Sequence, residues 1–228
     1  MKTYAIIPAG GKGKRSGSAT PKQYLKFNGK ELIAYTLSIF QQDKFIDELI
    51  IAAEEEYHPL LKKITEEQAL TKISKLVLSG DERQDSVYNS LKESGAADDD
   101  LIVVHDAARP LLPASVLSNA ILTARQKGNA VVCIKAKDTL IKAKKAITTY
   151  LNRDEVFYVQ TPQIFNAKDL GDAMENARKK NIKGTDESML VRKLGIEVNI
   201  VEGSVFNFKV TTEEDLKMFK ILSEKHLD

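Results

Sequence analysis

The clearest candidate for chemistry in this sequence is a cluster of glycines and cations that continues from the first apolar run. Residues 9–17 read AGGKGKRSG and extend directly from Tyr4–Ala9. Glycines allow backbone N–H groups to approach an anion closely, and the three cations add positive charge. With Lys22 of the following PKQY segment, four cations fall within eleven residues. The pattern favours a polyphosphate site over a flexible surface loop.

This loop fits neither of the two common glycine motifs. A dinucleotide fingerprint needs a third glycine where Ser16 stands, and its acid, about 20 residues on, should close a second strand. Glu31 opens a helical pattern instead, and no register of the loop matches a P-loop. A nucleotide would therefore bind here by another route, and a nicotinamide-dependent oxidoreductase is disfavoured.

Two further polar positions also follow apolar segments. Asp106 comes just after Leu101–Val104, and Gly80-Asp81 comes after Ile73–Leu78. Ligands in open α/β sheets bind beyond the carboxyl ends of the strands, so Asp106 is expected to act on a ligand or a metal. The alternative is a local turn in which Asp106 caps neighbouring N–H groups.

The elements that would position these residues alternate along the chain. Short apolar runs predict buried strands, at Tyr4–Ala9, Glu48–Ala53, Ile73–Leu78, Leu101–His105 and Ala130–Ile134. Helical periodicity predicts helices, around Leu32–Phe40, at Asp85–Ser94, at Pro113–Lys127 and after a capping signature at Thr212–Asp215. Repeated strand–helix–strand units imply right-handed crossovers and a layered α/β domain with a mostly parallel sheet.

The segment Lys135–Tyr158 departs from this alternation. Its short pieces of mixed polarity surround a lysine-rich centre at residues 142–145, a pattern typical of a hairpin-like arm. An arm with little apolar area is not stable alone, so we expect it to pack on another surface such as a second subunit. A long solvent-exposed loop is the alternative.

Composition limits the classes of function. The 228 residues contain 34 Lys plus Arg and 32 Asp plus Glu, a net charge of +2 that argues against a nucleic-acid partner. Tyr4–Ala9 is too short for a membrane span or a signal-peptide core. Cys133 is the single cysteine, and the three histidines have no metal-ligand spacing. We expect one cytoplasmic domain, residues 1–228, with no nucleic-acid or membrane partner.

Five stretches taken in order resemble a known family. They are the AGGKGKR loop with PKQY, GDERQDSV at 80–87, VHDAARP at 104–110, TPQ at 161–163 and NFKVT at 207–211. The first is similar to the nucleotide-triphosphate signature of sugar-nucleotide pyrophosphorylases. Together they resemble the 2-C-methyl-D-erythritol 4-phosphate cytidylyltransferases of the non-mevalonate isoprenoid pathway, over nearly the whole chain.

The resemblance implies a Rossmann-like sheet of the nucleotide-diphospho-sugar transferase type with a protruding β-arm at residues 136–158. It also implies CTP and a polyol phosphate as substrates, Mg²⁺ as cofactor, and a homodimer whose arms complete the neighbouring sites. The implied catalytic residues are Arg15, Lys22 and Lys209. The implied nucleotide-binding residues are Pro8, Ala9, Gly10, Gly11, Gly13, Gly80, Asp81 and Ser86. The implied substrate-binding residues are Asp106, Ala107, Arg109, Thr139, Arg153, Thr161, Thr185 and Lys209, with Asp106 also near the metal.

Several readings of these motifs stay open. Asp85 or Ser86 is also expected to cap the helix after the second turn. Thr161-Pro162-Gln163 is expected to form a turn that shapes the substrate site, and Lys209 to lie on a short strand. His105 is given no catalytic role. Ribitol-5-phosphate cytidylyltransferases share the same frame, and Val205–Thr212 resembles that branch somewhat more. A non-catalytic nucleotide-binding regulator is the alternative from another class.

Overall fold

The computed structural model describes residues 1–11 and 20–225, with the backbone alone at 224 and 225. The predicted loop residues Gly13 and Arg15 lie outside the described residues. The strands are β1 (Thr3–Pro8), β2 (Lys26–Phe27), β3 (Lys30–Glu31), β4 (Glu48–Ala53), β5 (Ile73–Leu78), β6 (Leu101–Val104), β7 (Asn129–Lys135), β8 (Leu140–Ala143), β9 (Ile147–Leu151), β10 (Phe157–Asn166) and β11 (Ile200–Glu202). The α-helices are α1 (Leu32–Gln42), α2 (His58–Glu67), α3 (Arg83–Ser94), α4 (Ala114–Lys127), α5 (Ala167–Lys179), α6 (Glu187–Arg192) and α7 (Glu213–Lys225). The short 3₁₀ helices are η1 (Lys22–Tyr24), η2 (Glu55–Tyr57) and η3 (Arg153–Glu155).

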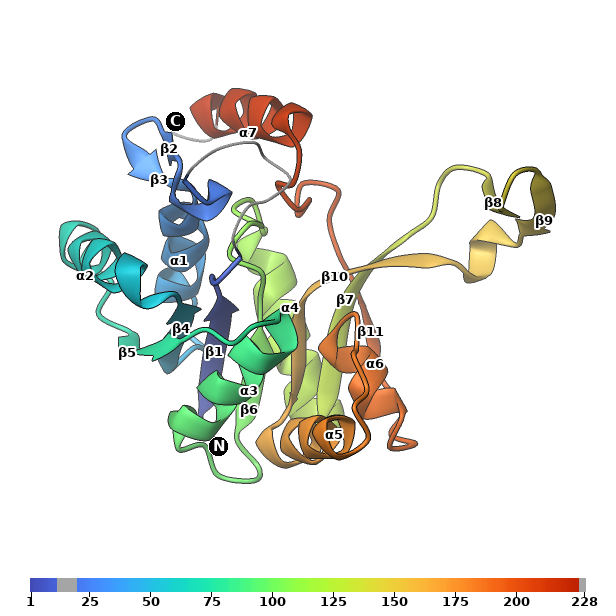
Figure 1. Ribbon diagram of the computed structural model, residues 1–228, viewed down its shortest axis with the longest axis horizontal. Coiled ribbons are helices and arrows are strands. Elements are labelled where there is room, and N and C mark those ends of the chain that lie inside the picture. Colours follow the sequence, from blue (N-terminus) through green and yellow to red (C-terminus); the bar gives the residue numbers. More distant parts are fainter. Residues whose placement is uncertain (12–19, 226–228) are drawn as a thin grey trace.

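One seven-stranded sheet organises the body, in the order β11-β7-β10-β6-β1-β4-β5 (Figure 1). All neighbouring pairs are parallel except those of β10, which runs antiparallel to β6 and to β7. The chain moves from β1 outward to β4 and β5, then returns to place β6 on the other side of β1. Ligands of open α/β sheets bind at such a reversal, so the carboxyl ends of β1 and β6 are the expected position of the site.

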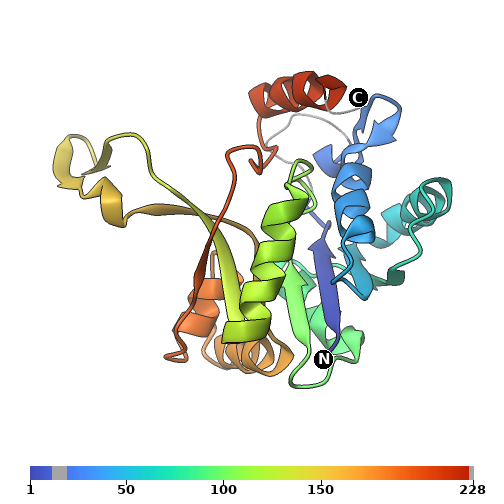
Figure 2. The same cartoon turned by 180° about the vertical axis from the view of Figure 1, so that it is seen from behind.

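Helices cover both faces of the sheet because its strands are apolar on both sides. Along β1, Ala5 and Ile7 belong to the core beneath α1, α2 and α4, which Figure 2 shows from that side. Tyr4 and Ile6 point the other way, into the core beneath α3, α5 and α6. Successive side chains of a strand alternate between faces, so a run of consecutive apolar residues builds both cores at once.

A third, smaller cluster joins α7 to the carboxyl edge of the sheet. Phe219 is fully buried and packs edge-on against Phe27 and Tyr35, at 5.2 Å between ring centroids in each case. The predicted capping signature is present. The hydroxyl of Thr212 accepts from the Asp215 N–H, and the Asp215 carboxylate accepts from the Thr212 N–H. These bonds fix the start of α7.

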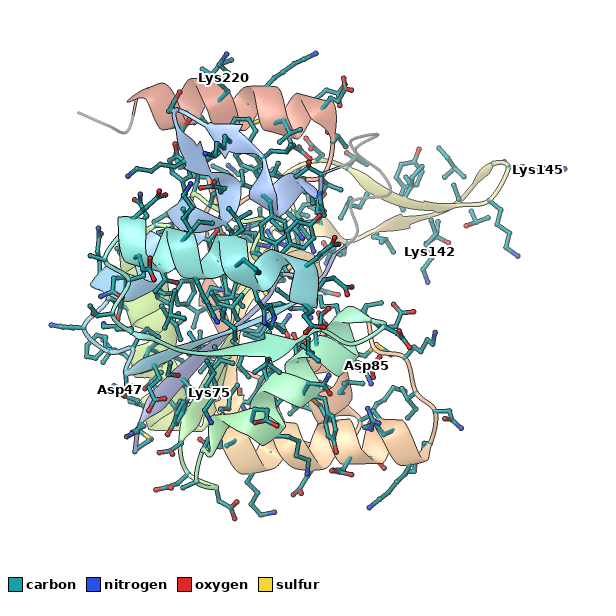
Figure 3. The ribbon with its side chains drawn as sticks, turned by 60° about the vertical axis from the view of Figure 1, so that its left-hand side comes forward. Asp47, Lys75, Asp85, Lys142, Lys145 and Lys220 are labelled. Carbon is teal, nitrogen blue, oxygen red and sulfur yellow. The ribbon has the colours of Figure 1, made fainter. Side chains whose placement is uncertain are left out.

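The predicted arm is an antiparallel hairpin of β8 and β9 that projects away from the body (Figure 1). Figure 3 shows Lys145 at its tip, with Lys142 nearby on the same arm. Ile141, Ile147 and Tyr150 are exposed on the hairpin. Apolar side chains exposed on a hairpin with so little packing of its own make it a candidate contact surface.

Two local expectations were wrong. Thr161-Pro162-Gln163 forms no turn but lies within β10, where the Thr161–Pro162 peptide is cis and the pairing with β7 shifts between Val159 and Gln163. An irregularity in one strand redirects side chains without ending the strand, which periodicity does not reveal. Lys209 does not lie on a strand. Its segment is irregular and is held by a bond from the Val210 N–H to the Ala108 carbonyl.

Candidate active site

The loop that leaves β1 is fastened by the PKQY segment. The Nε2 of buried Gln23 donates to the carbonyls of Ala9 (2.6 Å) and Gly11 (2.9 Å), and the Tyr24 hydroxyl donates to Ala9 at 3.2 Å. Lys22, which precedes Gln23, is therefore held beside the start of the glycine-rich loop. Gln23 was missed by the sequence analysis, although its place next to a candidate lysine was a signal.

Two predicted nucleotide-binding glycines sit where the chain leaves no room for a side chain. A Cβ at Gly10 would lie 2.3 Å from the Cβ of Ser79, which brings the loop after β1 against the turn after β5. A Cβ at Gly80 would lie 2.2 Å from the Cβ of Asp85. Both distances are far inside van der Waals contact, so glycine at position 10 allows the two loops to approach each other, and glycine at position 80 allows the turn to pack on the start of α3.

The helix cap after the second turn is Glu82, and the expectation of Asp85 or Ser86 was wrong. Glu82 and Asp85 form a reciprocal capping box. The buried hydroxyl of Ser86 accepts from the Gly80 N–H at 3.1 Å and donates to the Glu82 carbonyl at 3.2 Å. Ser86 therefore shapes the turn that carries Gly80 and the exposed Asp81.

A cavity of about 370 Å³ opens beside the glycine-rich loop. It is lined by Gly10, Gly11 and Gln23, and across from them by Glu54 and by Tyr57, which stacks on Tyr24 with 4.1 Å between ring centroids. A groove of similar size, about 410 Å³, lies between α3 and α5 near the amino end of β6. We place the site at the first because it adjoins the carboxyl ends of the parallel strands.

The acceptor side of the site is built around Asp106, which is buried just beyond β6. Its Oδ1 accepts from Nε of Arg83 at 2.9 Å, and its Oδ2 accepts from Nε of Arg109 at 3.3 Å and from Nζ of Lys209 at 3.0 Å. Burial alone would raise the pKa of Asp106, but the charges of Arg83, Lys209 and Arg109 outweigh burial and hold the pKa well below its usual range. The carboxylate is therefore ionised and saturated with cations.

Arg83 and Glu187 extend this cluster and were missed by the sequence analysis. Nη1 of Arg83 donates to Oε1 of Glu187 at 2.6 Å, and the Glu187 side chain is 1% exposed. Burial would lower the pKa of Arg83, but Glu187 and Asp106 raise it above its ordinary value. A signal was present, because Glu187 shares a helix face with buried Leu190 and Val191, where a carboxylate needs a partner.

The charges of this cluster do not cancel. Two carboxylates, Asp106 and Glu187, face three cations, Arg83, Arg109 and Lys209, which leaves one positive charge in excess. Lys209 is the most exposed of the three cations, with 41% of its side chain accessible. An anionic ligand is therefore attracted to Lys209 in particular.

A chain of hydrogen bonds lies beneath Asp106. The Asp106 N–H donates to Oγ1 of Thr161 at 3.1 Å, and Oγ1 lies 3.0 Å from Nδ1 of His105. Nε2 of His105 lies 3.2 Å from the carbonyl of Arg109. His105 is fully buried against the Phe40 ring, and burial lowers the pKa of its imidazole to about 4. The ring is therefore neutral near pH 7.

Asn207 ties the acceptor side to the segment before α7. Its side-chain amide donates to Oε1 of Gln160 at 3.1 Å and to the Thr161 carbonyl at 2.7 Å. Its backbone carbonyl accepts from Nη1 of Arg109 at 2.7 Å. Arg109 is therefore held at both ends, by Asp106 and by Asn207.

The structure gathers only some of the predicted substrate residues. Asp106, Arg109, Thr161 and Lys209 meet in one cluster. Ala107 is buried below the loop, where its carbonyl accepts from the Thr36 hydroxyl. Thr139, Arg153 and Thr185 are exposed and none is bonded to Asp106 in the described part of the chain. The first two belong to the projecting arm, whereas Thr185 precedes Glu187 and so adjoins the cluster.

A magnesium ion does not fit Asp106 in this arrangement. Both carboxylate oxygens are taken by cations, and Mg²⁺ would have to displace at least one of them against net positive charge. Within residues 1–11 and 20–225, no three His, Cys, Asp or Glu side chains are grouped so that they could hold a metal. No step of the chemistry is therefore assigned to a metal on Asp106.

A family model described as 2-C-methyl-D-erythritol 4-phosphate cytidylyltransferase matches residues 3–224. This chain belongs to that family. It is 41% identical over 227 residues to the cytidylyltransferase of that name from Clostridium botulinum strain Langeland, with 98% of each chain covered. It is 35% identical over 227 residues to the one from Halalkalibacterium halodurans, with 99% of each covered.

Solved structures agree with this membership. The 4-diphosphocytidyl-2C-methyl-D-erythritol synthase of Anaerococcus prevotii superposes with a TM-score of 0.85 at 26% identity, over 98% of this chain and 96% of that one. The 2-C-methyl-D-erythritol 4-phosphate cytidylyltransferase of Thermus thermophilus superposes with a TM-score of 0.80 at 29% identity, over 98% and 100%. The predicted fold class is confirmed. None of the helices in the described part of the chain has the length and apolar character for a membrane crossing.

Replacing Glu187 by Gln should destabilise the folded protein, because Arg83 of the cluster around Asp106 would lose a buried charged partner. We expect a loss of about 3 kcal/mol in the free energy of unfolding, the lower end for breaking a buried ion pair. Urea denaturation measures this. Glu67→Gln, which removes an exposed partner of Lys63, should change stability by no more than about 0.5 kcal/mol. Equal effects of the two variants would contradict the role given to Glu187.

Proposed function

We propose that this chain transfers CMP from CTP to 2-C-methyl-D-erythritol 4-phosphate and releases pyrophosphate. The observation that carries the proposal is the cationic cluster of Arg83, Arg109 and Lys209 around Asp106, next to the glycine-rich loop after β1. The loop suits a nucleoside triphosphate and the cluster suits the phosphate of a second substrate. The relatives reported above carry the methylerythritol name, so ribitol phosphate is not the favoured acceptor.

In this reaction an oxygen of the acceptor phosphate attacks the α-phosphorus of CTP. A new P–O bond forms, the bond from the α-phosphorus to the bridging oxygen breaks, and pyrophosphate leaves with the bonding electrons. Two anions must approach each other, so the protein contributes alignment and positive charge rather than a covalent intermediate. Lys22 and Arg15 would stabilise charge at the α-phosphate, and Lys209 and Arg109 would hold the acceptor phosphate.

Specificity for the nucleotide would come from backbone groups near Pro8, Ala9 and Gly80. The close packing of Gly10 on Ser79 brings the loop after β1 against the turn that carries Gly80, so backbone groups of both would be available to a base. Mg²⁺ is proposed as the cofactor, held mainly by triphosphate oxygens, because this ion usually binds through substrate phosphates with few carboxylates. A cytoplasmic location is proposed from the composition.

An acceptor assay tests this function directly. The purified protein should release pyrophosphate from CTP with methylerythritol phosphate and much more slowly with ribitol 5-phosphate. A preference for ribitol phosphate would move the chain to the related activity, and CTP binding without pyrophosphate release with either acceptor would favour a non-catalytic regulator.

Lys22→Ala should lower kcat by about 10²–10³, because one group that stabilises transition-state charge is typically worth that much. Lys30→Ala is the matched control, since Lys30 is an exposed lysine on the nearby strand β3. Steady-state rates with saturating CTP and acceptor measure both. Near-normal turnover in Lys22→Ala would show that Lys22 does not stabilise the transition state.

The arm is proposed to exchange between two copies of the chain. Support comes from apolar side chains exposed on the hairpin and on nearby strands and loops, at Ile141, Ile147, Tyr150, Phe157, Tyr158, Ile200, Val205 and Phe206. Thr139 and Arg153 of one arm would then reach the other copy's site.

Complementation tests this exchange. Lys209→Ala and Arg153→Ala proteins are each expected to be nearly inactive as homodimers. Mixed after dissociation, they should recover about a quarter of wild-type activity, because half of the random dimers carry one site with both groups intact. No recovery in mixed dimers, or a fully active monomer in analytical ultracentrifugation, would contradict arm exchange.

A further inference from the structure

The hydrogen-bonding direction at His105 follows from its partners. A backbone carbonyl accepts and never donates, so the contact of Nε2 with the Arg109 carbonyl places the ring proton on Nε2. In the neutral ring Nδ1 then has a lone pair and accepts. The Thr161 hydroxyl, 3.0 Å away, must therefore donate to Nδ1.

This arrangement fixes the orientation of the Thr161 hydroxyl. Its hydroxyl has one proton, which goes to His105, and one of its lone pairs accepts from the Asp106 N–H. While these bonds stand, Thr161 has no proton to donate to a phosphate oxygen. Its remaining lone pair could accept from a hydroxyl of a polyol.

This series of hydrogen bonds connects the two ends of the loop that follows β6, Asp106–Arg109, which we call the acceptor loop. One end is the N–H of Asp106 and the other is the carbonyl of Arg109, the two residues that hold Lys209 and the Asn207 carbonyl. The backbone N–H of His105 also donates to the Ile6 carbonyl of β1, at 3.0 Å. The backbone of His105 is therefore joined to β1, while its imidazole links the acceptor loop with the irregular part of β10.

We propose that His105 is a positioning residue for the acceptor phosphate: it fixes the Thr161 hydroxyl and the Arg109 carbonyl, and through them the geometry of Asp106 and Arg109. The alternative is a purely structural role, in which His105 only packs in the core beside Phe40. A space-filling role predicts changes in stability alone, whereas positioning predicts weaker use of the acceptor with CTP binding retained. This inference rests on the proposed function for its kinetic test.

The two ring nitrogens can be tested separately. In His105→Asn the side-chain oxygen can take the place of Nδ1, and the bond to Arg109 is lost. In His105→Gln the side-chain amide can take the place of Nε2, and the acceptor for Thr161 is lost. We expect each variant to raise KM for the acceptor roughly tenfold, the equivalent of one net hydrogen bond, with KM for CTP nearly unchanged.

Variants of Thr161 complete the design. Thr161→Val removes the bond to Nδ1 and also the acceptor of the Asp106 N–H, so it should raise KM for the acceptor at least as much as His105→Gln. The double variant should be no worse than Thr161→Val alone, because the bond that His105→Gln removes is already absent there. Thr161→Ser keeps the hydroxyl and should recover most of the acceptor binding that Thr161→Val loses. Unchanged KM for the acceptor in both His105 variants, or parallel increases in both KM values that follow a lower melting temperature, would overturn the proposal.

A measurement without substrate separates this inference from the proposed function. The chain has only three histidines, so ring nitrogens in ¹⁵N-labelled wild-type protein are assigned by comparison with His105→Asn. NMR should show His105 protonated at Nε2 and unprotonated at Nδ1, and the Asp106 amide should exchange faster in Thr161→Val but not in Thr161→Ser. A proton on Nδ1 overturns the proposal whatever the enzyme's acceptor is, whereas the expected tautomer with no transferase activity would count against the proposed function alone.

Discussion

The ion pairs of the buried Asp106 carboxylate are the interactions on which the rest of the site depends. An isolated carboxylate in a protein interior is strongly unfavourable, and this one is stabilised by Arg83, Arg109 and Lys209. Each of these cations comes from a different segment of the chain, at the start of α3, in the loop after β6 and before α7. Removing Asp106 would leave three positive charges close together, so the carboxylate holds these segments in one place.

The same cluster explains how a nearly neutral protein could attract a polyanion. Glu187 forms an ion pair with Arg83 and is itself buried, so it restrains this cation without being exposed to a ligand. Lys209 is the most exposed cation of the cluster. Acids and bases thus alternate from the interior outward and end in a positive group, which is the arrangement needed to receive a phosphate.

The two halves of the site are held by different means. On the nucleotide side the chain relies on close backbone approach at Gly10 and Gly80, and on the Gln23 amide that binds two carbonyls of the loop. On the acceptor side it relies on buried charge and on the neutral ring of His105. Backbone groups suit recognition of a base edge, whereas side-chain cations suit a phosphate, so the division matches the two substrates proposed.

The sequence by itself determined the sheet and the family. Consecutive apolar residues in Tyr4–Ala9 and Leu101–His105 predicted strands buried on both faces, because only a parallel sheet covered on both sides accepts such runs. The position of Asp106 after a strand predicted a ligand side chain. The motif resemblance identified the family, which the comparisons confirmed. These features are local or recur at short spacing, so a linear reading can detect them.

Only the tertiary structure decided which side chains contact Asp106 and which groups bond to His105. Arg83 and Lys209 contact Asp106 from 23 and 103 positions away in the sequence, and no local pattern encodes a contact over such distances. Thr161-Pro162-Gln163 was expected to form a turn, but β10 pairs with β7 before this segment and with both β6 and β7 from Gln163 onward, so the strand continues through it. The direction of the His105 bonds needs the Arg109 carbonyl and the Thr161 hydroxyl in place, and folding alone brings them together.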